Sequence, residues 1–165
     1  MPFNTLVLTC LVPETRLSEA GGNVSLQPLS DETILFFHID EKSNPRSTFR
    51  RDLKIEGKLC DGLVLYRKDD NLTLCLIELK GGDVEGACEQ ITNTHRYFKQ
   101  ALSTAMRDKK SGNQAVTSVI WKAYIYMHGA SPTDIKDYKI KLEKILGRNN
   151  CSIARHSDLG PFLRR

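Results

Sequence analysis

The spacing of hydrophobic and polar positions changes several times along the chain, and each change marks a predicted element. Continuous or alternating runs of apolar, β-branched and aromatic residues are typical of strands. Such runs predict strands over residues 6–12, 33–40, 61–67, 72–80, 115–129 and 151–156. Residues 13–30 mix proline and glycine with polar residues and are predicted to be mostly loop, with room for one helical turn.

Two other stretches place apolar residues three and four positions apart, which is the spacing of one buried helical face. The first follows the Gly81-Gly82 break, begins at Asp83 as its N-cap, and should end near residues 109–112. The second begins at residues 131–134 and should end at Gly147. The remaining segment, 53–67, is predicted to be extended, with a kink at Gly57 and a second at Gly62.

From residue 33 onward, the resulting order is strand, strand, strand, helix, strand, helix, strand. This order favours an α/β fold in which helices flank a mixed β-sheet. A length of 165 residues suits a single domain spanning 1–165. No apolar run approaches the roughly 18–20 residues of a membrane helix, and no basic segment precedes the first apolar run, so we expect a cytoplasmic protein without a membrane partner.

Five cysteines, an odd number without a C-x-x-C pair, lie mostly among apolar residues and are predicted to be reduced core thiols. The net charge of +4 permits an anionic partner without requiring one. The basic residues gather in short clusters, and five of them are candidates for phosphate contacts in a nucleic-acid complex. These five are Arg50, Arg51, Lys58, Arg96 and Lys99.

The two central strands place carboxylates against one another. If residues 68–71 form the turn of an antiparallel hairpin, Arg67 pairs with Leu72, and counting back brings Asp61 opposite Glu78. Like charges in that position are destabilising unless something offsets them. Lys80 projects from the same face as Glu78.

Burial makes this pair costlier, because a carboxylate in low dielectric must be protonated, paired with a cation or bound to a metal. Two carboxylates, a backbone carbonyl and waters are the hard oxygen ligands that Mg²⁺ prefers. The arrangement of Asp61, Glu78 and Lys80 therefore predicts a site for a divalent cation beside an ammonium group.

At these residues the sequence resembles the PD-(D/E)XK nuclease superfamily, which has the restriction-endonuclease-like fold. The match consists of Asp61, a polar turn, and Glu78-Leu79-Lys80 at the end of the next strand, within residues 55–128. The resemblance implies that Asp61 and Glu78 bind a catalytic Mg²⁺, for which Mn²⁺ can substitute, with help from the carbonyl of Leu79. It also implies that Lys80 assists the attacking water. Cys60 stands where the family name has proline, at a position that is not a ligand.

Many members of this superfamily carry a glutamine on the following helix, and Gln90 occupies that place here. In this superfamily a further acidic ligand often comes from the first helix. Four residues compete for this role, Glu14, Glu19, Glu32 and Glu56. The function that the resemblance implies is a metal-dependent nuclease acting on DNA or RNA, with DNA favoured, alone, as a homodimer or in a larger assembly.

Other interpretations stay open on the sequence alone. The Glu78-Leu79-Lys80 stretch can be a strand end with an exposed ion pair. The chain can also be a nuclease-fold module that has lost cleavage and serves nucleic-acid binding or assembly, which the lack of a third acid would favour. A third possibility is a binding domain unrelated to nucleases. His95, Trp121 and Tyr124 are predicted to be core residues.

Overall fold

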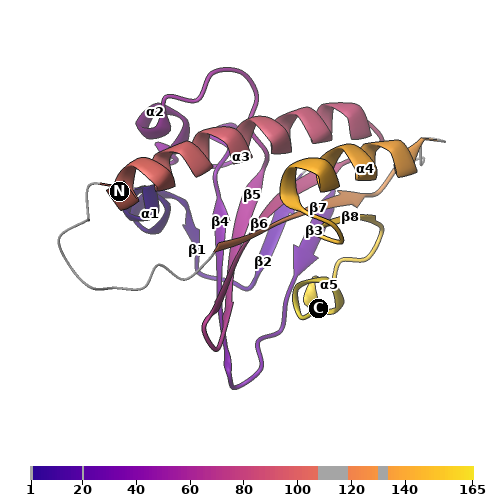
Figure 1. Cartoon of the computed structure of the whole chain (residues 1–165), viewed down its shortest axis with the longest axis horizontal. Helices are drawn as coiled ribbons and strands as arrows, with labels where there is room; N and C mark the ends of the chain where they lie inside the picture. The colour runs from indigo at the N-terminus through magenta and orange to yellow at the C-terminus, as the bar shows by residue number, and fades with distance from the viewer. Residues whose placement is uncertain (1, 20, 108–118, 130–133) are drawn as a thin grey trace.

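The computed structural model describes residues 2–19, 21–107, 119–129 and 134–165 (Figure 1). Its main sheet has six strands, in the order β1 (Leu11–Val12), β4 (Glu32–His38), β5 (Gly62–Lys68), β6 (Asn71–Lys80), β7 (Val119–Met127) and β8 (Cys151–Ala154). A second sheet is the hairpin of β2 (Arg16–Glu19) and β3 (Gly22–Ser25). The helical elements are α1 (Pro2–Thr5), η1 (Leu6–Cys10), α2 (Phe49–Leu53), α3 (Val84–Arg107), α4 (Ile135–Leu146) and α5 (Gly160–Leu163).

The six-stranded sheet is mixed, as predicted. Strands β1, β4, β5 and β6 pair antiparallel, whereas β7 and β8 continue the sheet in parallel with β6. Parallel neighbours require a crossover connection, and α3 lies between β6 and β7 in the chain while α4 lies between β7 and β8. The chain thus has an α/β fold in which helices flank a mixed sheet.

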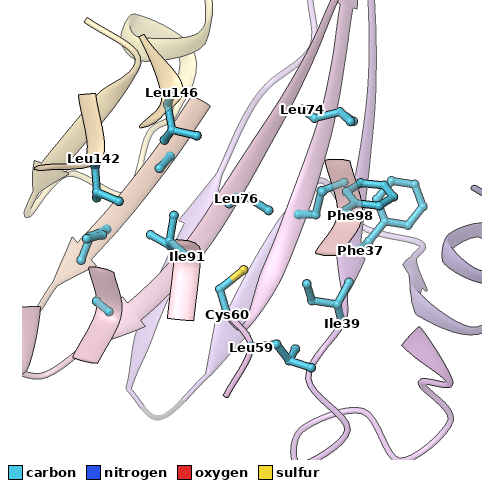
Figure 2. Close-up of a cluster of buried hydrophobic side chains, with 14 of the residues drawn as sticks. Phe37, Ile39, Leu59, Cys60, Leu74, Leu76, Ile91, Phe98, Leu142 and Leu146 are labelled. Carbon is cyan, nitrogen blue, oxygen red and sulfur yellow. The ribbon is translucent and has the colours of Figure 1, made fainter. Parts of the chain in front are cut away.

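Different elements cover the two faces of the sheet. On one face, α3 and α4 pack with α1, η1 and α2 over the strands, and Figure 2 shows part of this core, including Ile91, Phe98 and Leu142. On the other face, the β2–β3 hairpin and α5 bury Leu17, Val24 and neighbouring side chains. The sheet therefore lies between a layer of helices on one face and a small hairpin with α5 on the other.

The long helix follows its predicted pattern. The apolar stripe of α3 faces the core, from Val84 to Leu102. The Asp83 side chain caps the helix, because its Oδ1 accepts a hydrogen bond from the backbone N–H of Gly86 at 2.9 Å. His95 is buried with its ring edge against Trp121, so the prediction of a core histidine is confirmed.

The predictions for the N-terminal region were wrong at two places. Residues 6–10 form the π-helical turn η1 and not a strand, because Leu6 and Cys10, four positions apart, are buried while Leu8 between them is 80% exposed. Residues 16–25 form the β2–β3 hairpin where a loop was predicted. Each of these strands buries only one or two side chains, such as Leu17, so their alternation is too short to be seen as a pattern.

Three short helices were not predicted: α1 at the N-terminal end, α2 within the segment after β4, and α5 near the C-terminal end. Strand β5 begins at Gly62, and the predicted kink at Gly57 is confirmed by its left-handed φ of +77°. The predicted strand residues 115–118, the start of the second helix at 131–133, and the end of the first at 109–112 lie outside the described residues.

All five cysteines are buried and unpaired with one another. Among the helices that the structure describes, none combines the length and the apolar character that crossing a membrane would need.

Candidate active site

The hairpin of β5 and β6 has the register that the sequence predicts. Arg67 pairs with Leu72, and the ladder continues back to Gly62 at the start of β5. One step beyond, Asp61 and Glu78 are neighbours, because the backbone N–H of Asp61 donates to Oε2 of Glu78 at 3.2 Å. The hairpin therefore brings together two carboxylates that are 17 residues apart in the chain.

Both carboxylates are buried. Glu78 is 0% exposed and Asp61 is 6% exposed. Oδ2 of Asp61 accepts a hydrogen bond from the backbone N–H of Leu79 at 2.7 Å. Leu79, which the resemblance gives as a carbonyl ligand, thus also fixes the Asp61 side chain through its amide. The two reciprocal bonds lock the carboxylates across the hairpin.

Lys80 is the cation beside this pair. Its Nζ lies 2.8 Å from Oε1 of Glu78, and its side chain is 24% exposed, so it reaches from solvent into the buried site. Oε1 has no other partner among the residues that the structure describes. One ammonium therefore serves two buried carboxylates, Glu78 directly and Asp61 at longer range.

The local electrostatics follow from this imbalance. Burial raises the pKa of Glu78 to about 8, and the nearby Asp61 adds to the effect. Burial likewise raises the pKa of Asp61 to about 7, although the bond from Leu79 opposes it. Burial disfavours the charged form of Lys80, but its bond to Glu78 and the negative charges of Glu78 and Asp61 together outweigh this and raise the pKa of the amine. Near neutral pH, the pair thus retains protons that a bound cation would displace.

Two further acids lie beside Asp61. One carboxylate oxygen each from Glu19, Asp40 and Asp61 lies within 4.8 Å of the others. Glu19 comes from the end of β2, and Asp40 follows β4. Burial raises the pKa of Asp40. Of the four candidates for an additional acidic ligand, Glu19 is the one that the structure places next to the predicted pair.

Glu19 is held by two polar side chains. Its Oε2 lies 3.2 Å from Nε2 of His38, and its Oε1 accepts a hydrogen bond from the hydroxyl of Ser43. The bond with His38 lowers the pKa of Glu19, so this carboxylate is ionised more readily than the deeper pair. It is also the more accessible, with a side chain that is 22% exposed.

The other three candidates lie elsewhere. Glu32 is at the opposite end of β4 from His38, where it forms a two-pronged ion pair with Arg164 and accepts a bond from the hydroxyl of Tyr66. Glu14 and Glu56 are exposed and outside the acidic cluster. The suggestion that Glu32 could complete the site was therefore wrong, because its carboxylate already has a full set of partners.

Gln90 supports the site without touching the carboxylates. Its Nε2 donates to the carbonyl of Leu59 at 2.9 Å. One turn later on α3, the hydroxyl of Thr94 accepts a bond from the backbone N–H of Cys60 at 3.0 Å. These bonds fix the backbone immediately before Asp61, so the role of Gln90 in this structure is to position that residue.

Three of the five predicted phosphate-contact residues line grooves along α3. Lys58 and Arg96 line a groove between α3 and α4, and Arg96 and Lys99 line its continuation along α3. Arg50 pairs with Glu41 and donates to the carbonyl of Gly57, whereas Arg51 is 78% exposed. This leaves Lys58, Arg96 and Lys99 as the continuous part of the set.

Sequence reasoning missed Asp40. The residue ends the apolar run at 33–40, just as Asp61 precedes the next buried strand. The backbone N–H groups of Ile39 and Asp40 both reach the carbonyl of Asp61, at 3.0 and 3.4 Å. Antiparallel pairing of the two runs would have revealed the proximity, since the end of one strand must meet the start of the next.

The site thus consists of four acidic residues, Glu19, Asp40, Asp61 and Glu78, at the ends of β2, β4, β5 and β6. Lys80 lies beside Glu78, the most deeply buried of the four. Comparison of the chain with protein-family models, with curated proteins and with solved structures gave no match.

Proposed function

We propose that the protein is a metal-dependent nuclease that hydrolyses phosphodiester bonds, with DNA as the preferred substrate and a restriction-endonuclease-like core. The observation that carries the proposal is the convergence of Asp61, Glu78 and Lys80 at the end of one hairpin, with both carboxylates buried. A buried pair of acids beside a single ammonium is costly unless a further cation offsets it. A purely structural role would not explain why two carboxylates are buried beside a single ammonium group.

The donor set fits Mg²⁺. Carboxylate oxygens are the hard ligands that this ion prefers, and it commonly binds through one or two of them while substrate phosphate completes its shell. Asp61 and Glu78 would hold the ion, and Glu19 and Asp40 would add negative charge on the other side of Asp61. When bound, the ion stabilises the charge that develops on the phosphate.

The remaining roles belong to the side chains. The pKa of Lys80 is raised by Glu78, so the amine stays protonated near neutral pH. It therefore acts as a hydrogen-bond donor that orients the attacking water or a phosphate oxygen, and not as the base. Gln90 keeps the backbone before Asp61 in place.

The principal alternative, a module that binds nucleic acid without cutting it, was favoured by the lack of a third acid. Glu19 and Asp40 lie beside Asp61, which supports the active enzyme over that alternative. The basic residues around the groove would contact phosphates along the substrate. Charge reversal at Arg96 or Lys99 should therefore weaken binding in a salt-dependent way.

The test is cleavage of single- and double-stranded DNA and RNA by the purified protein with Mg²⁺, Mn²⁺ or EDTA. Glu78→Gln and Lys80→Met remove the charges of the site. The matched controls are Glu143→Gln and Lys139→Met, which break a partly exposed ion pair of 3.8 Å on α4. We expect metal-dependent cleavage that the site variants lose and the control variants keep.

The proposal fails if the wild type cuts none of these substrates with either metal, or if cleavage persists in EDTA. It also fails if folded Glu78→Gln cuts as fast as the wild type. Titration calorimetry with Mn²⁺ tests the metal site separately from cleavage. If Glu78 is a metal ligand, the heat of Mn²⁺ binding should fall in Glu78→Gln.

A further inference from the structure

A pair of stacked rings stands next to the strand end that carries Lys80. Lys80 pairs with Met127 at the end of β7, and the backbone N–H of His128 donates to the carbonyl of Lys80 at 3.0 Å. Because Lys80 and Met127 point to the same face of the sheet, the His128 side chain lies on the other face, toward the β2–β3 hairpin, where its neighbour Gly22 pairs with Glu19 of the acidic cluster. His128 is exposed.

Tyr126 supports the imidazole ring of His128. The ring centroids are 6.3 Å apart and the planes differ by 29°, a stacked arrangement. Tyr126 is partly buried and packs against the core between the sheet and the β2–β3 hairpin. The exposed ring of His128 is therefore held in place by Tyr126. Little side-chain entropy should be lost when a ligand binds against this ring.

Glycines surround these rings. A Cβ on Gly22 would lie 3.1 Å from a ring carbon of Tyr126 and 3.4 Å from one of His128. A Cβ on Gly81 would meet only Cε1 of His128 within 4 Å, at 3.7 Å. Gly81 and Gly82 are exposed. The rim between Lys80 and His128 thus lacks side chains, which is the condition for close approach of a ligand to the backbone.

We propose that His128, supported by Tyr126, is a stacking platform for the base of a nucleotide whose phosphate is bound at the acidic cluster of Glu19, Asp40 and Asp61. This inference rests on the proposed nuclease function and specifies its substrate class. A base inside a duplex is stacked on both faces, whereas an unpaired base can offer a face to a side-chain ring. The preferred substrate is therefore single-stranded nucleic acid, or an unpaired end.

Binding is measured without cleavage, in EDTA, with oligothymidylate carrying one 2-aminopurine at successive positions. Stacking quenches the fluorescence of 2-aminopurine, so wild-type protein should quench it most at one position. Aromatic stacking contributes about 1–3 kcal/mol per base, so His128→Ala should weaken binding of the single strand at least about fivefold. His128→Phe, which keeps a ring and removes the imidazole, should restore most of the affinity and the quenching.

Arg148→Ala is the control for loss of an exposed basic side chain, because Arg148 follows α4 away from the rings. In the cleavage assay, the His128→Ala variant should raise KM for the single strand with little change in kcat, because the ring binds substrate without touching the reacting atoms. If the protein also cuts a blunt duplex, His128→Ala should have little effect on that cleavage.

Two outcomes would overturn the inference in distinguishable ways. If the wild type cuts a single strand but His128→Ala binds and cuts it equally well, the platform is refuted and the nuclease function stands. If the wild type neither binds nor cuts any of the oligonucleotides, both proposals fall together. A loss in His128→Ala that His128→Phe does not restore would also refute stacking, because it would assign the effect to the imidazole itself.

Discussion

Replacing Glu78 with glutamine should stabilise the metal-free protein at pH 8. The substitution keeps the shape of the side chain and an oxygen that can accept the bond from the backbone N–H of Asp61. It removes one of two buried negative charges, so Lys80 is left with a single carboxylate partner, Asp61. The site is then electrically balanced without a metal ion.

The magnitude follows from the raised pKa of Glu78, which changes from 4.5 to about 8 on folding. Between these values, the folded protein binds more protons than the unfolded chain, so stability falls as the pH rises. Each pKa unit corresponds to about 1.4 kcal/mol, which makes the loss by pH 8 about 4 kcal/mol for this group alone. Because Asp61 shares the charge, we expect Glu78→Gln to gain about 2–4 kcal/mol at pH 8 and close to none near pH 4.5.

The assay is urea denaturation of wild type and Glu78→Gln in EDTA at several pH values from about 4.5 to about 8, with Glu143→Gln as the control. The wild-type free energy of unfolding should fall with pH relative to the Glu78→Gln variant, and the control should follow the wild type. A variant that is less stable than the wild type at pH 8 would refute the reasoning. It would show that the ion pair between Glu78 and Lys80 outweighs the burial of the charge.

Three further predictions follow from other contacts. A fixed concentration of Mg²⁺ should raise the melting temperature more at pH 8 than at pH 6, because the ion competes with the protons of the buried acids; an equal rise at both values would contradict the site. Gly62→Ala would place a Cβ 2.3 Å from Cδ2 of Leu17, so it should lower the free energy of unfolding in urea by about 1–3 kcal/mol. It should also weaken Mn²⁺ binding in calorimetry, because it displaces the β2–β3 hairpin that carries Glu19. Gly81→Ala, with no contact closer than 3.7 Å, is its control for stability and should unfold like the wild type. Arg164→Ala should lower the melting temperature at pH 7 but much less near pH 3. The bond from Arg164 holds the pKa of Glu32 at about 2, and the stabilisation that this gives disappears as the pH falls from 4.5 toward 2. An equal drop in melting temperature at both pH values would assign the effect to packing.

The core of the candidate site could be predicted from sequence because its parts are close in the chain. Asp61 and Glu78 belong to one hairpin, whose short turn fixes the pairing of every later residue. Asp69 at that turn adopts a φ of 52°, as tight hairpin turns require. Once the turn is placed, period-two geometry decides that the two carboxylates are neighbours and that Lys80 shares their face.

The long helix was predictable for a similar reason. A stripe repeated over many turns, as in α3, is a strong signal. The β2–β3 hairpin and the turn η1 gave no such signal, because each buries only a few side chains. What stabilises them is packing against β4, β5 and one another, which local spacing does not encode.

The sequence by itself therefore determined the α/β order of elements, the register of the central hairpin and the pairing of Asp61 with Glu78, all of which depend on local geometry. Only the tertiary structure brought Glu19 and Asp40 to the same carboxylate, paired Glu32 with Arg164 and joined the backbone of His128 to that of Lys80. These contacts join strands from distant parts of the chain. Their positions are decided by how the hairpin and the C-terminal helix α5 pack on the sheet, and that packing depends on the whole set of buried side chains at once.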